Sequence, residues 1–91
     1  MVTVQAVPQG DGWVCEVDVD DDGSKTHHFV TVTREGLERW GRGADRQAAE
    51  DLVKRSFDFL LEREPATSIL RTFDLAVIRS YFPEYDRRFG R

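Results

Sequence analysis

The chain has 91 residues, of which 40% are hydrophobic and 33% are charged, and this balance is typical of a globular protein rather than a disordered one. A chain of this length has no room for a second hydrophobic core, so we expect a single domain over residues 1–91. The formal net charge of −4 argues against a free-standing nucleic-acid binder, which usually presents a basic face, although it does not exclude a local basic patch.

The composition also restricts the cellular setting. Cys15 is the only cysteine, so the chain can form neither an internal disulfide nor a cysteine-rich zinc site. Residues 1–12 lack the basic and apolar regions of a signal peptide. No run approaches the roughly 18 apolar residues that a membrane span requires. We therefore expect a cytoplasmic protein without a membrane partner.

The first third of the chain has the pattern of an antiparallel sheet. Three segments, at about 2–7, 13–19 and 27–33, are rich in valine, threonine and aromatic residues. Each is bounded by glycine, proline or aspartate, which are typical of turns. The pattern predicts a three-stranded antiparallel meander over residues 1–33.

The register of this meander follows from its turns. A two-residue turn at Asp22-Gly23 would pair Cys15 with Val30, and a similar turn in the first break would pair Ala6 with Cys15. A three-residue loop would instead place valines opposite acidic residues. The two-residue turns gather one mostly apolar face, made of Val2, Val4, Ala6, Trp13, Cys15, Val17, Val19, Thr26, His28, Val30 and Val32.

The second turn raises the question of a metal site, because Asp18, Asp20, Asp22 and Gly23 match the D-x-D-x-D-G opening of a calcium loop. Such a loop also uses a bidentate glutamate at its twelfth position, which is Phe29 here. In a strand, moreover, alternate aspartates point separately into solvent. The sequence favours a turn, with no metal ligand and no cofactor, and leaves a weak metal binder as an alternative.

Residues with catalytic chemistry are few. Cys15 faces the predicted core, where a thiol is inert. His27 and His28 are adjacent, so a strand directs them to opposite faces, and we expect His28 to be a partly buried, hydrogen-bonded residue rather than a ligand. No serine lies in a G-x-S-x-G turn, and the chain has no phosphate-binding loop. We therefore predict no catalytic residue and a protein that is not an enzyme.

The remaining residues, 34–91, are predicted to be helical. Helices at about 34–40, 45–63 and 68–82 would pack on one face of the meander and give a two-layer α+β fold. Thr33 and Asp45 are candidate N-caps for the first two helices. The apolar residues of the second helix span about 220° of its circumference, wider than one sheet contact requires. This width suggests a further surface to cover, and a homodimer would cover it.

The end of the chain mixes arginine with aromatic residues in "RSYFPEYDRRFGR". Interleaved arginine and aromatic side chains can contact phosphates and stack on bases. The alternative is a helical tail whose aromatic side chains fold back onto the core. We favour the second interpretation, because Glu84 and Asp86 dilute the positive charge.

Two resemblances bear on the function. The segment "FLLEREPATSILRTFDLAVIRSYFPEY", residues 59–85, resembles a segment shared by short, uncharacterised bacterial proteins. This resemblance implies a small, free-standing bacterial domain and implies no activity. A meander followed by a helix is also similar to HicB-type antitoxins, but only at the level of the fold. The sequence shows no glycine-cysteine strand end of their kind, and it predicts no final strand after the helix.

The sequence therefore predicts a non-catalytic interaction or accessory domain that binds a protein partner or a second copy of itself. The alternative is a nucleic-acid-linked regulator of the antitoxin type, and the further alternative is the weak metal binder at the aspartate-rich hairpin.

Overall fold

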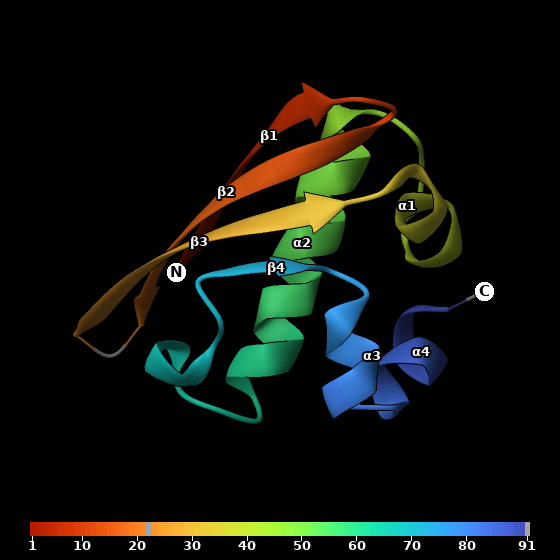
Figure 1. Cartoon of the computed structure of the whole chain (residues 1–91). Coiled ribbons are helices and arrows are strands. Elements are labelled where there is room, and N and C mark those ends of the chain that lie inside the picture. Colours follow the sequence, from red (N-terminus) through yellow and green to blue (C-terminus); the bar gives the residue numbers. More distant parts are fainter. Residues whose placement is uncertain (22, 91) are drawn as a thin grey trace.

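A four-stranded sheet with helices on one face forms the framework of the protein, a two-layer α+β fold (Figure 1). The computed structural model describes residues 1–21 and 23–90. The strands lie in the order β1-β2-β3-β4. They span Val2–Gln9 (β1), Gly12–Asp21 (β2), Ser24–Val32 (β3) and Thr72–Asp74 (β4).

The predicted register of the meander is confirmed. Ala6 pairs with Cys15, and Cys15 pairs with Val30. The strands are longer than predicted, because pairing continues to Gln9 and Gly12 in the first hairpin and to Asp21 and Ser24 in the second. Gly10 and Gly23 have φ angles of 60° and 83°, a region that glycine enters without steric cost.

The predicted inner face of the sheet is confirmed as well. The side chains of Val17, Val30 and Val32 are fully buried, and the helices cover them. Trp13 lies on this face but is only partly buried, because it sits at the margin of the core. The opposite face carries polar residues together with two exposed apolar side chains, Val7 and Phe29.

Two helices begin at the predicted caps. The helix α1, Arg34–Trp40, starts after Thr33, whose hydroxyl oxygen accepts the N–H of Gly36 at 3.0 Å. The helix α2, Arg46–Leu61, starts after Asp45, whose carboxylate accepts the N–H of Ala48 at 2.9 Å. In the described part of the chain, no helix is long and apolar enough to cross a membrane.

The wide apolar face of α2 is covered from two sides within one chain. One side lies against the sheet, with β1 as its main contact. The other side meets the end of the chain, where the ring of Phe59 packs 5.4 Å from that of Tyr85 and 5.8 Å from that of Phe89. The width of this face therefore no longer argues for a second copy.

The predicted helix at 68–82 is wrong. This segment instead begins at the end of a short 3₁₀ helix, η1 (Ala66–Ser68), and continues through β4 to the helix α3 (Val77–Tyr81). A further helix, α4, spans Glu84–Phe89. The strand β4 pairs parallel with β3, so the N–H of Phe29 donates to the carbonyl of Arg71 at 2.7 Å. This pairing gives hydrogen-bond partners to backbone N–H and C=O groups at the otherwise open edge of β3. That gain outweighs the helical preference of the local sequence.

Candidate functional site

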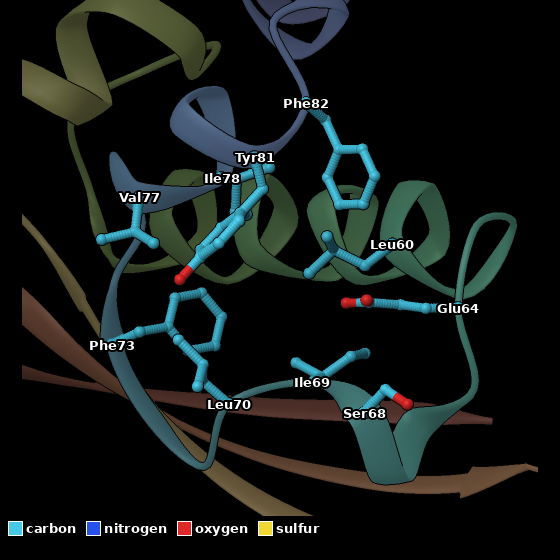
Figure 2. A pocket seen from close by; sticks show the side chains of 10 residues that line it. All are labelled: Leu60, Glu64, Ser68, Ile69, Leu70, Phe73, Val77, Ile78, Tyr81 and Phe82. Atoms are coloured by element: carbon cyan, nitrogen blue, oxygen red, sulfur yellow. The ribbon is translucent and has the colours of Figure 1, made fainter.

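An apolar hollow of about 220 Å³ lies between the end of α2, η1 and α3 (Figure 2). Its walls come from both layers of the fold, because Phe73 of β4 contributes to it together with the helical residues. The lining residues are Leu60, Glu64, Ser68, Ile69, Leu70, Phe73, Val77, Ile78, Tyr81 and Phe82.

The chain path explains why this hollow exists. The sequence Glu64-Pro65 ends the helical run after α2, since the residue before a proline disfavours the helical region. The chain then turns through η1 and reaches the sheet edge, with Ile69 buried below it. After β4 the chain forms α3, which lies beside α2 (Figure 2). The hollow is the space left between the end of α2, η1 and α3.

Two large side chains at the hollow remain in contact with solvent. Leu70 is 50% exposed, and Tyr81 is 66% exposed. A single exposed leucine is ordinary, but two such side chains beside an apolar depression form a continuous surface that a ligand could cover.

The only carboxylate in the lining belongs to Glu64. This residue is half-buried, and Figure 2 shows its carboxylate pointing into the hollow, between Leu60 and Ile69. Within residues 1–21 and 23–90, no hydrogen bond or ion pair engages this group. A carboxylate directed over apolar side chains loses part of its hydration and gains no partner in return.

The neighbouring cation is committed elsewhere. The guanidinium of Arg63 donates to the carbonyl of Phe59 at 2.9 Å and pairs with Glu62 and Glu84. The guanidinium also stacks on the ring of Phe59, with the Cζ atom of Arg63 3.6 Å from the ring centroid. Arg63 is therefore held away from the carboxylate of Glu64.

The aspartate-rich hairpin does not gather ligands in its described part. The carboxylate of Asp18 lies 2.6 Å from Nδ1 of His27, and Asp20 is an exposed strand residue. Asp22, the third predicted ligand of the alternative, lies outside the described residues. Across positions 1–21 and 23–90, no group of three or more histidine, cysteine or acidic side chains is arranged to hold a metal ion.

His27 bridges two acidic residues on the open face of the sheet. Its Nδ1 faces Asp18, and its Nε2 lies 3.0 Å from a carboxylate oxygen of Glu16. Both contacts are favourable only when both ring nitrogens carry protons, so the hydrogen bond that His27 donates to Asp18 and the two negative charges raise the pKa of His27.

His28, predicted to be hydrogen-bonded, and Cys15, predicted to be inert in the core, are both buried. The side chain of His28 is 1% exposed and so more deeply buried than predicted, and the predicted hydrogen bonding is confirmed, because its nitrogens contact the carbonyl of Leu70 at 2.8 Å and the hydroxyl of Thr26 at 2.9 Å. The Cys15 thiol is fully buried. Burial, with a smaller contribution from Glu50, raises its pKa to about 12, which suppresses the reactive thiolate.

Three of the four aromatic residues at the end of the chain, Phe82, Tyr85 and Phe89, pack on the core, whereas Tyr81 is exposed. Tyr85 is fully buried, and its hydroxyl lies 2.7 Å from that of Ser56. Asp86 holds α4 against α1, because its carboxylate accepts hydrogen bonds from Arg39 and from the indole of Trp40. These donors lower the pKa of Asp86. The tail is therefore fixed through Phe89 and is not a free arginine-aromatic arm.

Sequence reasoning did not identify the hollow. It located surplus apolar surface on α2 and on the tail. Tyr81 of that tail is indeed exposed at the hollow, but Leu70 belongs to the segment between α2 and the tail. The available signal was the number of apolar residues after Pro65.

No protein-family model, curated protein or solved structure matches the chain. The resemblance of residues 59–85 to short bacterial proteins therefore stays a prediction, and no functional residue is transferred from a relative.

Proposed function

We propose that this chain is a small interaction or accessory domain, without catalytic chemistry, that binds a segment of another polypeptide in the hollow beside α3. The observation that supports the proposal is an apolar depression with Leu70 and Tyr81 exposed at it. Concave apolar surfaces that include aromatic side chains are typical of interaction sites.

The size of the hollow favours a polypeptide over a small molecule. Sites for small ligands and cofactors usually enclose about 300–1,000 Å³. The volume here is about 220 Å³, which suits one or two side chains of a partner. The remaining contact area would come from the surrounding surface, including Leu70 and Tyr81.

A second copy of this chain is one candidate partner, but a symmetric contact through the hollow is disfavoured. In a twofold arrangement the same patch occurs on both subunits, so two Glu64 carboxylates would approach each other without a counter-charge. Light scattering across a wide concentration range tests self-association. A dimer that survives dilution would make the second copy the partner.

A direct test uses random peptides displayed on phage. Selection is carried out on the intact chain and in parallel on a Leu70→Ser/Tyr81→Ser variant. We expect peptides that bind the intact chain and bind the variant at least tenfold more weakly. Val7→Ser is the matched control, since Val7 is 59% exposed on the other face of the sheet. Equal enrichment on both proteins, or none on either, would contradict the proposal.

The nucleic-acid alternative is supported by a second hollow, of about 240 Å³, at the end of the chain. Its lining includes Arg42, Arg55 and Arg88. The Nη2 atom of Arg55 is buried and has no hydrogen-bond partner among the described residues. A phosphate oxygen could accept that hydrogen bond.

Acidic groups weaken this alternative. Asp58 lines the same hollow, and Arg55 and Arg88 already pair with Asp51 and Glu62. A nucleic-acid regulator would bind DNA or RNA with an affinity that falls steeply with salt, and would lose affinity when Arg87 and Arg88 are replaced. Absence of binding at low salt would remove this candidate.

A further inference from the structure

The carboxylate of Glu64 indicates the charge of the ligand. It is the only ionisable carboxylate in the lining of the apolar hollow, and it has no partner in the described part of the chain. A ligand that brings a cation to this position would compensate for lost hydration with a charge-assisted hydrogen bond. A neutral ligand would cover the carboxylate and leave it unpaired, which is unfavourable.

The rest of the lining fits the stem of a basic side chain. Ile69 and Leu70 supply aliphatic surface, and Tyr81 and Phe82 supply aromatic rings. Lysine and arginine bury their methylene stems along apolar surface while their charged ends stay at a polar group, and aromatic faces attract cations. The hollow combines both requirements within a volume suited to a side chain.

The charge of the whole protein supports the same ligand. The formal net charge is −4, which favours the approach of a basic partner over an acidic one. The arginine nearest to Glu64 in sequence, Arg63, is held by Glu62, Glu84 and the Phe59 carbonyl, so it does not supply the missing cation.

We infer that the hollow binds a lysine or arginine side chain of the partner segment, with its stem on Ile69, Leu70 and Tyr81 and its cation at Glu64. This inference deepens the proposed function and rests on it. The partner segment is therefore a basic one, and binding weakens as salt concentration rises.

The test compares three probes that share an apolar stem and differ in charge: hexylammonium, 1-hexanol and hexanoate. Each is titrated into the isotopically labelled chain, and binding is followed by the amide and methyl chemical shifts of the residues that line the hollow. We expect hexylammonium to bind about three- to tenfold more tightly than hexanol, in the range of a partly exposed charge pair, and hexanoate to bind most weakly.

Two variants separate charge from shape. Glu64→Gln should remove the preference for hexylammonium while hexanol binds as before. Glu62→Gln is the matched control: Glu62 precedes Glu64 by two residues and pairs with Arg63 and Arg88, outside the lining of the hollow. The preference for the cation should survive in this variant.

The outcomes distinguish the two proposals. Equal affinity for hexylammonium and hexanol, or a preference that persists in Glu64→Gln, would overturn the inference about charge and leave the docking site standing. If none of the three probes shifts the resonances of the hollow, the docking site itself is wrong. A preference for hexylammonium that depends on Glu64 and not on Glu62 would support both.

Discussion

The buried hydroxyls of Ser56 in α2 and Tyr85 in α4 form a hydrogen bond. Its geometry predicts how far the effects of replacing the two residues on the free energy of unfolding depart from additivity. The hydroxyl of Ser56 donates to the carbonyl of Leu52 at 2.7 Å, which uses its only proton. The hydroxyl of Tyr85, 2.7 Å from Ser56 Oγ, must therefore be the donor in the second bond. Both side chains are fully buried, so water cannot replace either partner.

The two single substitutions should differ in cost. Ser56→Ala leaves the Tyr85 hydroxyl buried without an acceptor, which costs about 1–3 kcal/mol of unfolding free energy, reduced by about 0.5 kcal/mol because alanine favours a helix more than serine does. Tyr85→Phe leaves Ser56 bonded to Leu52 and removes one ordinary hydrogen bond, which costs about 0.5–1.5 kcal/mol.

The double variant is the decisive measurement. Replacing both partners removes the bond without leaving an orphaned hydroxyl, so its cost should be smaller than the sum of the single costs by about 1 kcal/mol. Urea unfolding followed by circular dichroism measures each free energy, provided the dependence on urea is the same in all four proteins. Additive costs, within about 0.3 kcal/mol, would refute the reasoning and show that Tyr85 does not donate to Ser56.

Three further predictions concern groups away from the hollow. The free energy of unfolding should fall as pH rises from about 9 to 12, because the unfolded chain ionises Cys15 and Tyr85 near their ordinary pKa values of 9.0 and 10.0, whereas burial raises both pKa values to about 12 in the folded chain. The loss of unfolding free energy over this pH range should be smaller in Tyr85→Phe, which would confirm that ionisation of Tyr85 contributes to it. A free energy of unfolding in the intact chain that does not change with pH would contradict the prediction. The folded-state pKa of His27, measured by NMR titration, should exceed its ordinary value of 6.5 and should decrease in Asp18→Asn. The stabilisation from His27 is therefore complete below pH 6.5 and is lost as pH rises through the raised pKa, and a pKa unaffected by Asp18→Asn would exclude that contact as its cause. Glu50→Ala should lower the free energy of unfolding by about 1–3 kcal/mol in a urea titration, since it removes the carboxylate that accepts the partly buried N–H of Ala6 in β1 at 2.9 Å, and an unchanged midpoint would show that this hydrogen bond does not stabilise the fold.

The three-stranded meander could be predicted from the sequence because local rules determine it, whereas β4 was not predicted. Valine alternation and two-residue glycine turns specify both the strands and their register, and an error of one residue would have exposed the whole inner face. The caps at Thr33 and Asp45 are also local, since each needs only an acceptor side chain beside the first helical turn.

The segment after Pro65 could not be predicted in the same way, because its outcome depends on a distant strand. Ile69, Phe73, Leu75 and Ile78 are all buried, and this spacing fits a helix as well as a short strand followed by a turn. The choice is made by the edge of β3, which accepts a parallel partner at Phe29. The sequence of residues 68–82 alone does not indicate that the edge of β3 is open, so the strand could not be predicted from it.

This error and the candidate site have the same physical origin. A continuous helix over 68–82 would lie along α2, bury its apolar face there and leave no hollow. The strand β4 draws the middle of the segment onto the sheet, so only short helical pieces remain to cover the end of α2. The hollow between η1 and α3 results from this path of the chain onto the sheet. Leu70 and Tyr81 are exposed at the hollow. A surface that forms only when the whole fold has assembled is present in the folded chain and absent from the unfolded one. A partner that binds there should therefore also raise the free energy of unfolding, by an amount set by its concentration relative to its dissociation constant.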